Sequence, residues 1–186
     1  MNIEIISGSP RAASLSNRVA RFLKNQLLAT TEHNVNIVDV RDWNLPPLQE
    51  VWTSVEKTPF AFQSLAKRMF QADAFILVSP EFNGSYTPAM KNLLDHFPKQ
   101  HRKTFGIVTA SPGAMGGMRA SQQMQLLVGA LFGILAPHML IVPAVDKKFD
   151  ENANLVDPSF QKAIDTFTGE FLWLAEAVRY KDLAAA

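Results

Sequence analysis

Short apolar runs alternate with longer amphipathic segments along the chain. Residues 2–7 and 35–40 are rich in isoleucine and valine, which predicts two β-strands. Residues 74–79 are continuously apolar, as expected for a strand that is covered on both faces of a parallel sheet. Two further strands are predicted over residues 105–110 and 138–142.

Apolar residues at helical spacing separate these strands. They predict helices within residues 19–27, 62–69, 88–97, 117–135 and 158–178. Strand–helix alternation of this kind builds an α/β fold with an open doubly wound sheet, whose ligands bind beyond the carboxyl ends of the strands. No linker, repeat or low-complexity tract interrupts the pattern, so residues 1–186 are predicted to form a single domain.

Composition excludes several classes of function. The net charge of +1 argues against a broad nucleic-acid surface, and the absence of cysteine excludes thiol catalysis and cysteine metal sites. The four histidines show no i, i+4 pair on one helix, so no metal site is predicted. No signal peptide is recognisable, and no apolar run reaches the roughly 18 residues needed to span a membrane. A cytoplasmic protein without a membrane partner is expected.

The loop after the first predicted strand reads SGSPRAASLSN, residues 7–17, and contains four serines and one arginine. Its hydroxyls and the Arg11 guanidinium lead directly into a helix N-terminus with free backbone N–H groups, a combination that favours a dianionic phosphate. The GxxxxGK[ST] and GxGxxG patterns are both absent. Helix capping by Ser14 or Ser16 is the simpler alternative, but it does not explain Arg11.

The loop after the third predicted strand begins SPEFNGSYTPAMKNLLD, residues 79–95. Pro80, Asn83 and Gly84 predict a turn whose backbone amides face the same crevice, and such donors suit a flat heterocycle. An ordinary turn before a helix would need the same residues. This loop alone therefore leaves both interpretations open.

The loop after the fourth predicted strand reads ASPGAMGGMRAS, residues 110–121. Its three glycines, Gly113, Gly116 and Gly117, would let the backbone approach a ring closely. They could equally form a flexible connection into the next helix, so this segment is a weak signal by itself.

Together the three loops resemble the NADPH-dependent FMN reductase family, which includes small quinone, azo and chromate reductases. The motifs GSPRAASLS, SPEFNGSYTPAMKNLLD and SPGAMGGMRA stand in order, each after a predicted strand, and the resemblance covers residues 1–145. It implies a flavodoxin-like doubly wound five-stranded parallel sheet of order 2-1-3-4-5 with helices on both faces. It also implies a noncovalently bound FMN.

The resemblance assigns the cofactor-binding residues in three groups. The FMN phosphate would lie among Ser9, Arg11, Ser14 and either Ser16 or Asn17, because the usual asparagine of the first motif is replaced by Ser16. Phe82 stands where the family often has tyrosine. The isoalloxazine would be bordered by Pro80, Glu81, Phe82, Asn83, Gly84 and Ser85, with Ser111 and Gly113 on its other rim.

The activity implied is that of an FMN-dependent NAD(P)H oxidoreductase. NADPH or NADH would pass hydride to flavin N5, and a small acceptor (quinone, azo compound, flavin or metal oxyanion) would take the electrons. The chemistry then belongs to the cofactor, and no catalytic side chain is predicted. A homodimer, possibly pairing into tetramers, is implied as well, and the apolar residues 126–135 are a candidate surface for it.

Two alternatives remain at this stage. A flavodoxin-type electron carrier would bind FMN without a substrate of its own, but flavodoxins are typically strongly acidic and lack an arginine in the phosphate loop. The net charge of +1 and Arg11 therefore favour a reductase. A nucleotide sensor without enzymatic activity is the weaker alternative.

Overall fold

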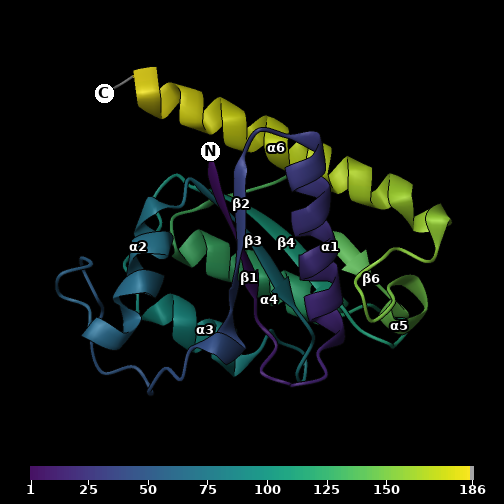
Figure 1. Cartoon of the computed structure of the whole chain (residues 1–186), viewed down its shortest axis with the longest axis horizontal. Helices are drawn as coiled ribbons and strands as arrows, with labels where there is room; N and C mark the ends of the chain where they lie inside the picture. Colours follow the sequence, from purple (N-terminus) through teal and green to yellow (C-terminus); the bar gives the residue numbers. More distant parts are fainter. Residues whose placement is uncertain (185–186) are drawn as a thin grey trace.

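A single parallel sheet organises the chain (Figure 1). The computed structural model describes residues 1–184, with side chains up to Arg179. The strand order β2-β1-β3-β4-β5 confirms the predicted doubly wound arrangement. The strands are β1 Asn2–Ser7, β2 Asn34–Asp39, β3 Ala74–Ser79, β4 Thr104–Ala110, β5 Ile134–Leu135 and β6 Leu140–Val142.

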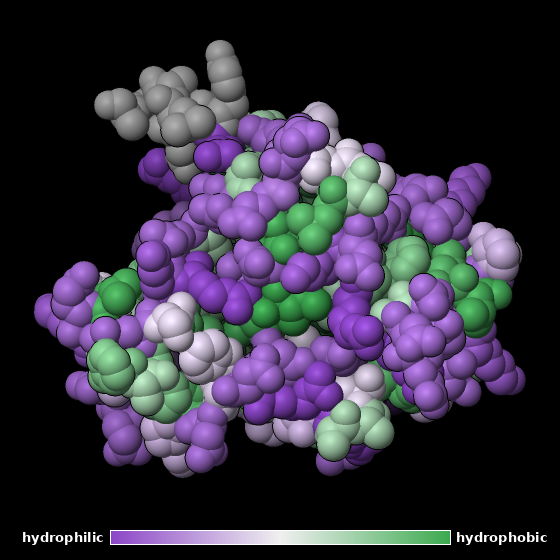
Figure 2. Space-filling model, viewed as in Figure 1, coloured by the Kyte–Doolittle hydropathy of each residue, from purple (hydrophilic) through white to green (hydrophobic). Residues whose placement is uncertain are grey.

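Helices cover both faces of the sheet, and each face has its own apolar core. One core lies beneath three helices: α1 Leu15–Thr30, α5 Val145–Lys148 and α6 Gln161–Ala184. The core on the other face is covered by α2 Gln63–Gln71, α3 Pro88–Asp95 and α4 Met118–Ala130. Short 3₁₀ turns occupy Val40–Asp42, Phe60–Phe62 and Pro158–Phe160. On the face covered by α1 and α6, apolar groups form separate patches among hydrophilic ones (Figure 2).

The strand prediction succeeds best at the centre of the sheet. All residues of β3 and β4 are buried, because helices cover both faces there. In β1, Ile3 and Ile5 face the core under α1, whereas Ile6 faces the core under α2 and α3. Continuous apolar runs in the sequence therefore mark these central strands.

The predicted bounds of the fourth helix and the fifth strand are wrong. Helix α4 ends at Ala130, and the apolar residues that follow it enter the sheet as β5. Leu135 pairs with Phe105 and Leu140 pairs with Val108, so residues 136–139 bulge beside Gly106 and Ile107 of β4. Pro137 lies in this bulge and has no N–H to donate to a ladder. The fifth position of the sheet therefore holds two short strands.

Candidate functional site

The loops after β1, β3 and β4 meet at the carboxyl edge of the sheet, at the bottom of Figure 1. The Gly8 N–H donates to the Val78 carbonyl at 2.9 Å, and the Thr87 hydroxyl donates to the Gly8 carbonyl. These two bonds join the first loop to the end of β3 and to the start of α3. Six almost fully buried hydroxyl residues line the edge: Ser7, Ser9, Ser16, Ser79, Thr87 and Thr109.

Ser14 begins helix α1 as its N-cap. Its hydroxyl accepts a hydrogen bond from the Asn17 N–H at 3.1 Å and lies 3.2 Å from the Ser16 hydroxyl. Ser14 therefore caps α1, and its predicted contact with a phosphate stays a prediction. The first N–H groups of a helix have no partner within the helix, so the pair of hydroxyls sits beside free backbone donors.

Asn17 has a structural role that the sequence left open. Its amide nitrogen donates to the Ser7 hydroxyl at 3.0 Å and to the Asp39 carboxylate at 2.8 Å. An asparagine amide carries two N–H donors, and both are engaged in these bonds. Asn17 thus fastens α1 to the ends of β1 and β2.

Arg41, just after β2, is a site residue that the sequence reasoning missed. Its Nε and Nη2 atoms donate to the two oxygens of Asp39 at 2.9 and 2.6 Å, and Nη1 donates to the Ala12 carbonyl at 2.9 Å. The hydrogen bond to Asp39 raises the pKa of Arg41. Arg41 therefore holds the first loop to the neighbouring strand, and no local pattern in the sequence marks its contact with Ala12.

Replacing Arg41 with methionine should loosen the first loop. One hydrogen bond contributes about 0.5–1.5 kcal/mol, so the affinity for FMN is expected to fall about three- to tenfold. Riboflavin lacks the phosphate, and its affinity should be unchanged in a parallel fluorescence titration. Arg41→Met alone would leave the buried Asp39 carboxylate without its arginine partner. The double variant Asp39→Asn/Arg41→Met controls for this effect. Equal losses for both flavins would contradict a role in phosphate binding.

Further arginines surround the outer side of the first loop. A cavity of about 410 Å³ is lined by Ser14, Arg18, Arg21 and Arg41, among other residues. Arg18 also donates to the Phe149 carbonyl at 3.0 Å, which links α1 to the segment after α5. The loop thus lies in a setting rich in cationic side chains.

The second loop contains a two-residue turn. The N–H groups of Phe82 and Ser85 donate to each other's carbonyls, at 2.8 and 3.1 Å. Asn83 and Gly84 both have positive φ, 50° and 85°, which defines a type I′ turn. The predicted turn is thereby confirmed, and neither bond uses the N–H of Asn83 or Gly84.

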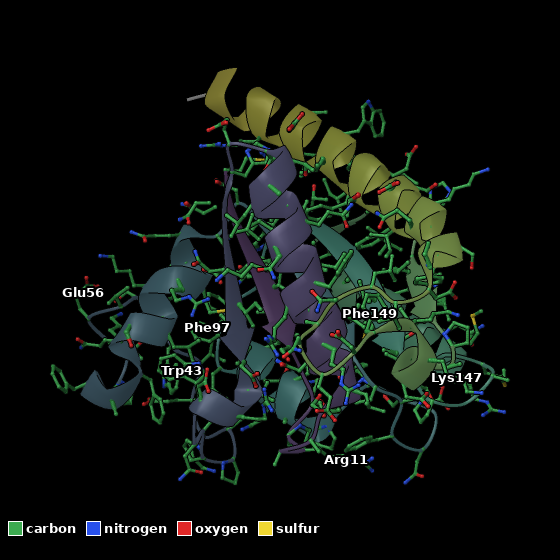
Figure 3. The ribbon with its side chains drawn as sticks, turned by 45° about the vertical axis from the view of Figure 1, so that its right-hand side comes forward. Arg11, Trp43, Glu56, Phe97, Lys147 and Phe149 are labelled. Carbon is green, nitrogen blue, oxygen red and sulfur yellow. The ribbon has the colours of Figure 1, made fainter. Side chains whose placement is uncertain are left out.

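Phe82 connects the first two loops. The Arg11 guanidinium carbon lies 4.9 Å from the centroid of the Phe82 ring, within cation–π range. Arg11 is exposed and lies at the lower edge of the sheet in Figure 3. The structure therefore brings together the guanidinium of the first motif and the aromatic ring of the second.

Glu81 caps the N-terminus of helix α4. One of its carboxylate oxygens accepts the Arg119 N–H at 3.1 Å, and the other lies 3.5 Å from the Arg119 guanidinium. The N-cap of α4 is Gly117, which has no side chain for this purpose. Glu81 supplies the missing cap and thus fixes the second loop to the third.

The glycines of the third loop differ in what their backbone requires. An added Cβ on Gly113 would meet only the Ser111 hydroxyl, at 3.4 Å, whereas one on Gly116 would lie 2.7 Å from Ile141 and Pro143. Gly116 and Gly117 also have positive φ, 61° and 89°. Packing thus demands glycine at 116, and the predicted contact of Gly113 with a ring stays a prediction.

The residues at this edge fit an FMN molecule. The Thr109 hydroxyl is fully buried at the end of β4 and has no hydrogen-bond partner among the described residues. Clustered hydroxyls and Arg11 suit a phosphate, and the turn at 83–84 offers backbone N–H groups to a heterocycle. Within residues 1–184, no group of three or more His, Asp or Glu residues is arranged to hold a metal ion. Nor does any helix there have the length and apolarity to cross a membrane.

Known proteins with similar sequences include reductases. An FMN-dependent NADPH-azoreductase of Staphylococcus saprophyticus is 27% identical over 188 residues, covering 96% of this chain and 97% of that protein. A quinone reductase of Pseudomonas putida is also 27% identical, covering 89% of this chain and 92% of its own length.

A solved structure supports the fold. The flavoenzyme FerB of Paracoccus denitrificans, an NAD(P)H:(acceptor) oxidoreductase, superimposes with a TM-score of 0.76 at 19% identity, covering 94% of this chain and 97% of its own. The sequence model of the family described as NADPH-dependent FMN reductase matches residues 1–147. With most of its length matched, including all three loops of the site, the chain belongs to the NADPH-dependent FMN reductase family.

Proposed function

We propose that the chain, acting as a single domain over residues 1–186, passes electrons from a nicotinamide through FMN to a small acceptor such as a quinone, an azo compound, free flavin or a metal oxyanion. Family membership makes it an oxidoreductase that uses FMN and NAD(P)H. One observation carries the proposal: Arg11 with its serine hydroxyls lies beside the type I′ turn at one edge of the sheet.

In this proposal the first loop holds the FMN phosphate. Arg11 supplies the positive charge, and Ser9, Ser14 and Ser16 supply hydroxyls. Ser16 is preferred to Asn17 because the Asn17 amide donors are already bonded to Ser7 and Asp39. The turn and Phe82 border the ring on one side, with Pro80 and Ser85 at its base, and Ser111 and Gly113 border it on the other.

FMN, when bound, would supply two-electron chemistry between the nicotinamide and the acceptor. The protein positions both partners and stabilises negative charge on the ring through the backbone N–H groups of Asn83 and Gly84. Glu81 is engaged with the first turn of α4, so it does not serve as an acid. No histidine lies in the loops after β3 and β4.

No histidine should therefore be essential for turnover. His33 pairs with Glu176 at 2.9 Å, and His96 packs on Trp52 with a ring-centroid distance of 4.5 Å, so both have structural partners. Each of the four His→Gln variants should keep the rate of FMN reduction by NADPH within about tenfold of wild type, roughly 1.4 kcal/mol of barrier. Stopped-flow bleaching of the flavin measures this rate. A variant that retains its FMN yet reacts a thousandfold more slowly would reveal a catalytic histidine.

The proposed activity is tested by mixing the FMN-loaded protein with NADPH and then with a quinone. Bleaching of the flavin by NADPH alone, followed by reoxidation by the quinone, is the expected result. A flavodoxin-type carrier would stay oxidised until a separate reductase was added. That outcome would overturn the proposed reductase activity.

A homodimer is also part of the proposal. Several large apolar residues on α4 and the segment after it are exposed: Leu126 by 69%, Phe132 by 56% and Ile134 by 37%. Such residues would be buried by a second copy, and sedimentation of the purified protein tests this. A cytoplasmic location stays a prediction.

A further inference from the structure

A second cavity lies at the amino edge of the sheet, opposite the flavin loops. Its volume is about 350 Å³, and it is enclosed by the end of α2, the segment before β4 and helix α6. No motif of the sequence analysis falls on it. The side chains that give it chemical character are Asp73, His101, Arg102, Lys103 and Arg179.

Lys103 is the partly buried amine of this cavity. Its Nζ atom lies 3.3 Å from the Met69 carbonyl and 3.5 Å from the Phe70 carbonyl, at the C-terminal end of α2, and 5.3 Å from the Phe75 ring centroid. These hydrogen bonds are long, and no carboxylate of the described side chains forms an ion pair with Lys103. These weak contacts offset only part of the free energy of hydration that the ammonium group loses on burial.

The charged groups around Lys103 come from three elements. Asp73 stands between α2 and β3, Arg179 lies on α6, and His101 and Arg102 precede Lys103 in the chain. Asp73 already accepts the Asn2 N–H at 2.7 Å and lies 3.7 Å from Arg179 Nε. Burial outweighs the attraction of Asp73 and lowers the pKa of Lys103 from 10.5 to about 8. About a tenth of the amine is then neutral at pH 7.

We propose that Lys103 is a nucleophilic site for acyl phosphates, with Arg179 binding the phosphate group of the incoming reagent. The Nζ lone pair attacks the acyl carbon, a C–N bond forms, and the C–O bond to phosphate breaks. Inorganic phosphate leaves, and the proton lost from nitrogen passes to solvent. The product is a neutral amide on Lys103, and no oxidant or reductant is needed.

The cavity favours an acyl phosphate over other acyl donors. An acyl phosphate is a compact dianion, which cationic side chains attract and hold. Arg179 and Lys103 line the same cavity, so a reagent bound at Arg179 through its phosphate is brought to the cavity that contains Lys103. A neutral ester has no phosphate that Arg179 could bind.

The experiment is acetylation of the FMN-loaded protein by acetyl phosphate at pH 7.5, with the rate at each lysine followed by mass spectrometry of peptides. Exposed Lys67 and Lys99 are the internal controls. Lys103 is expected to react at least tenfold faster than either, with a rate that levels off above pH about 8. A rate at Lys103 equal to or below those of Lys67 and Lys99 would overturn the proposal.

Two variants distinguish binding of the phosphate by Arg179 from the reactivity of the Lys103 amine. Arg179→Gln should lower the rate with acetyl phosphate at least fivefold and leave the rate with p-nitrophenyl acetate, a neutral ester, unchanged. Lys103→Arg should abolish labelling at this position with both reagents. If Arg179→Gln leaves both rates unchanged, Arg179 does not bind the phosphate, and the proposal fails in that part. FMN content should stay constant throughout, because the flavin loops lie at the opposite edge.

Discussion

Replacing Arg11 with alanine should weaken FMN binding ten- to a hundredfold while leaving the apoprotein folded. Hydrogen bonds to charged groups contribute about 1.5–3 kcal/mol each, and every 1.4 kcal/mol is a tenfold change in affinity. The fold loses little, because the Arg11 side chain is exposed and contacts the Phe82 ring. The deficit should therefore appear in the cofactor complex alone.

Fluorescence titration of the apoprotein with FMN and with riboflavin measures this effect. Only FMN carries the phosphate, so only its affinity should fall in Arg11→Ala. Lys67→Ala, which removes an exposed cation on α2 outside the three loops, is the control. Unchanged affinity for FMN would show that the phosphate lies elsewhere. Equal losses for both flavins would mean that Arg11 acts through Phe82 on the ring instead.

Much of the fold was predictable because burial dictates the sequence pattern. The predicted strand 74–79 coincides with β3, which is buried along its whole length. The chain must use apolar residues there on both faces, and that leaves an uninterrupted run. The location of the site was predictable for a related reason: loops at the carboxyl ends of adjacent parallel strands meet in space, whatever their separation in sequence.

Features that depend on distant partners were not predictable. Arg41 contacts the carbonyl of Ala12, 29 residues earlier, and no local pattern marks that pair. The segment 131–135 is apolar enough for either a helix or a strand, and pairing with Phe105 of β4 decides the outcome. The role of Glu81 likewise depends on the bare N-cap at Gly117, which lies 36 residues further along the chain.

Valine substitutions at Gly116 and Gly113 should differ in their effect on stability. At Gly116 the new Cβ would lie 2.7 Å from Ile141 and Pro143, on a backbone with φ of 61°. Overpacking costs about 1–3 kcal/mol, and a strained backbone conformation adds about 1–3 kcal/mol. Gly116→Val is therefore expected to lower the free energy of unfolding of the apoprotein by several kcal/mol, as measured by urea denaturation.

Gly113→Val should leave that free energy within about 0.5 kcal/mol of wild type, as expected for an exposed site without special backbone geometry. Gly113→Val should instead impair flavin binding: if Gly113 borders the isoalloxazine, the added side chain occupies the space of the ring. The affinities for FMN and riboflavin should then fall together, at least tenfold, because the two flavins share the ring. Normal binding of both flavins by Gly113→Val would place the rim of the ring elsewhere in the third loop. Joint loss of stability and binding in Gly116→Val would still follow, since Gly116 positions that loop against β6.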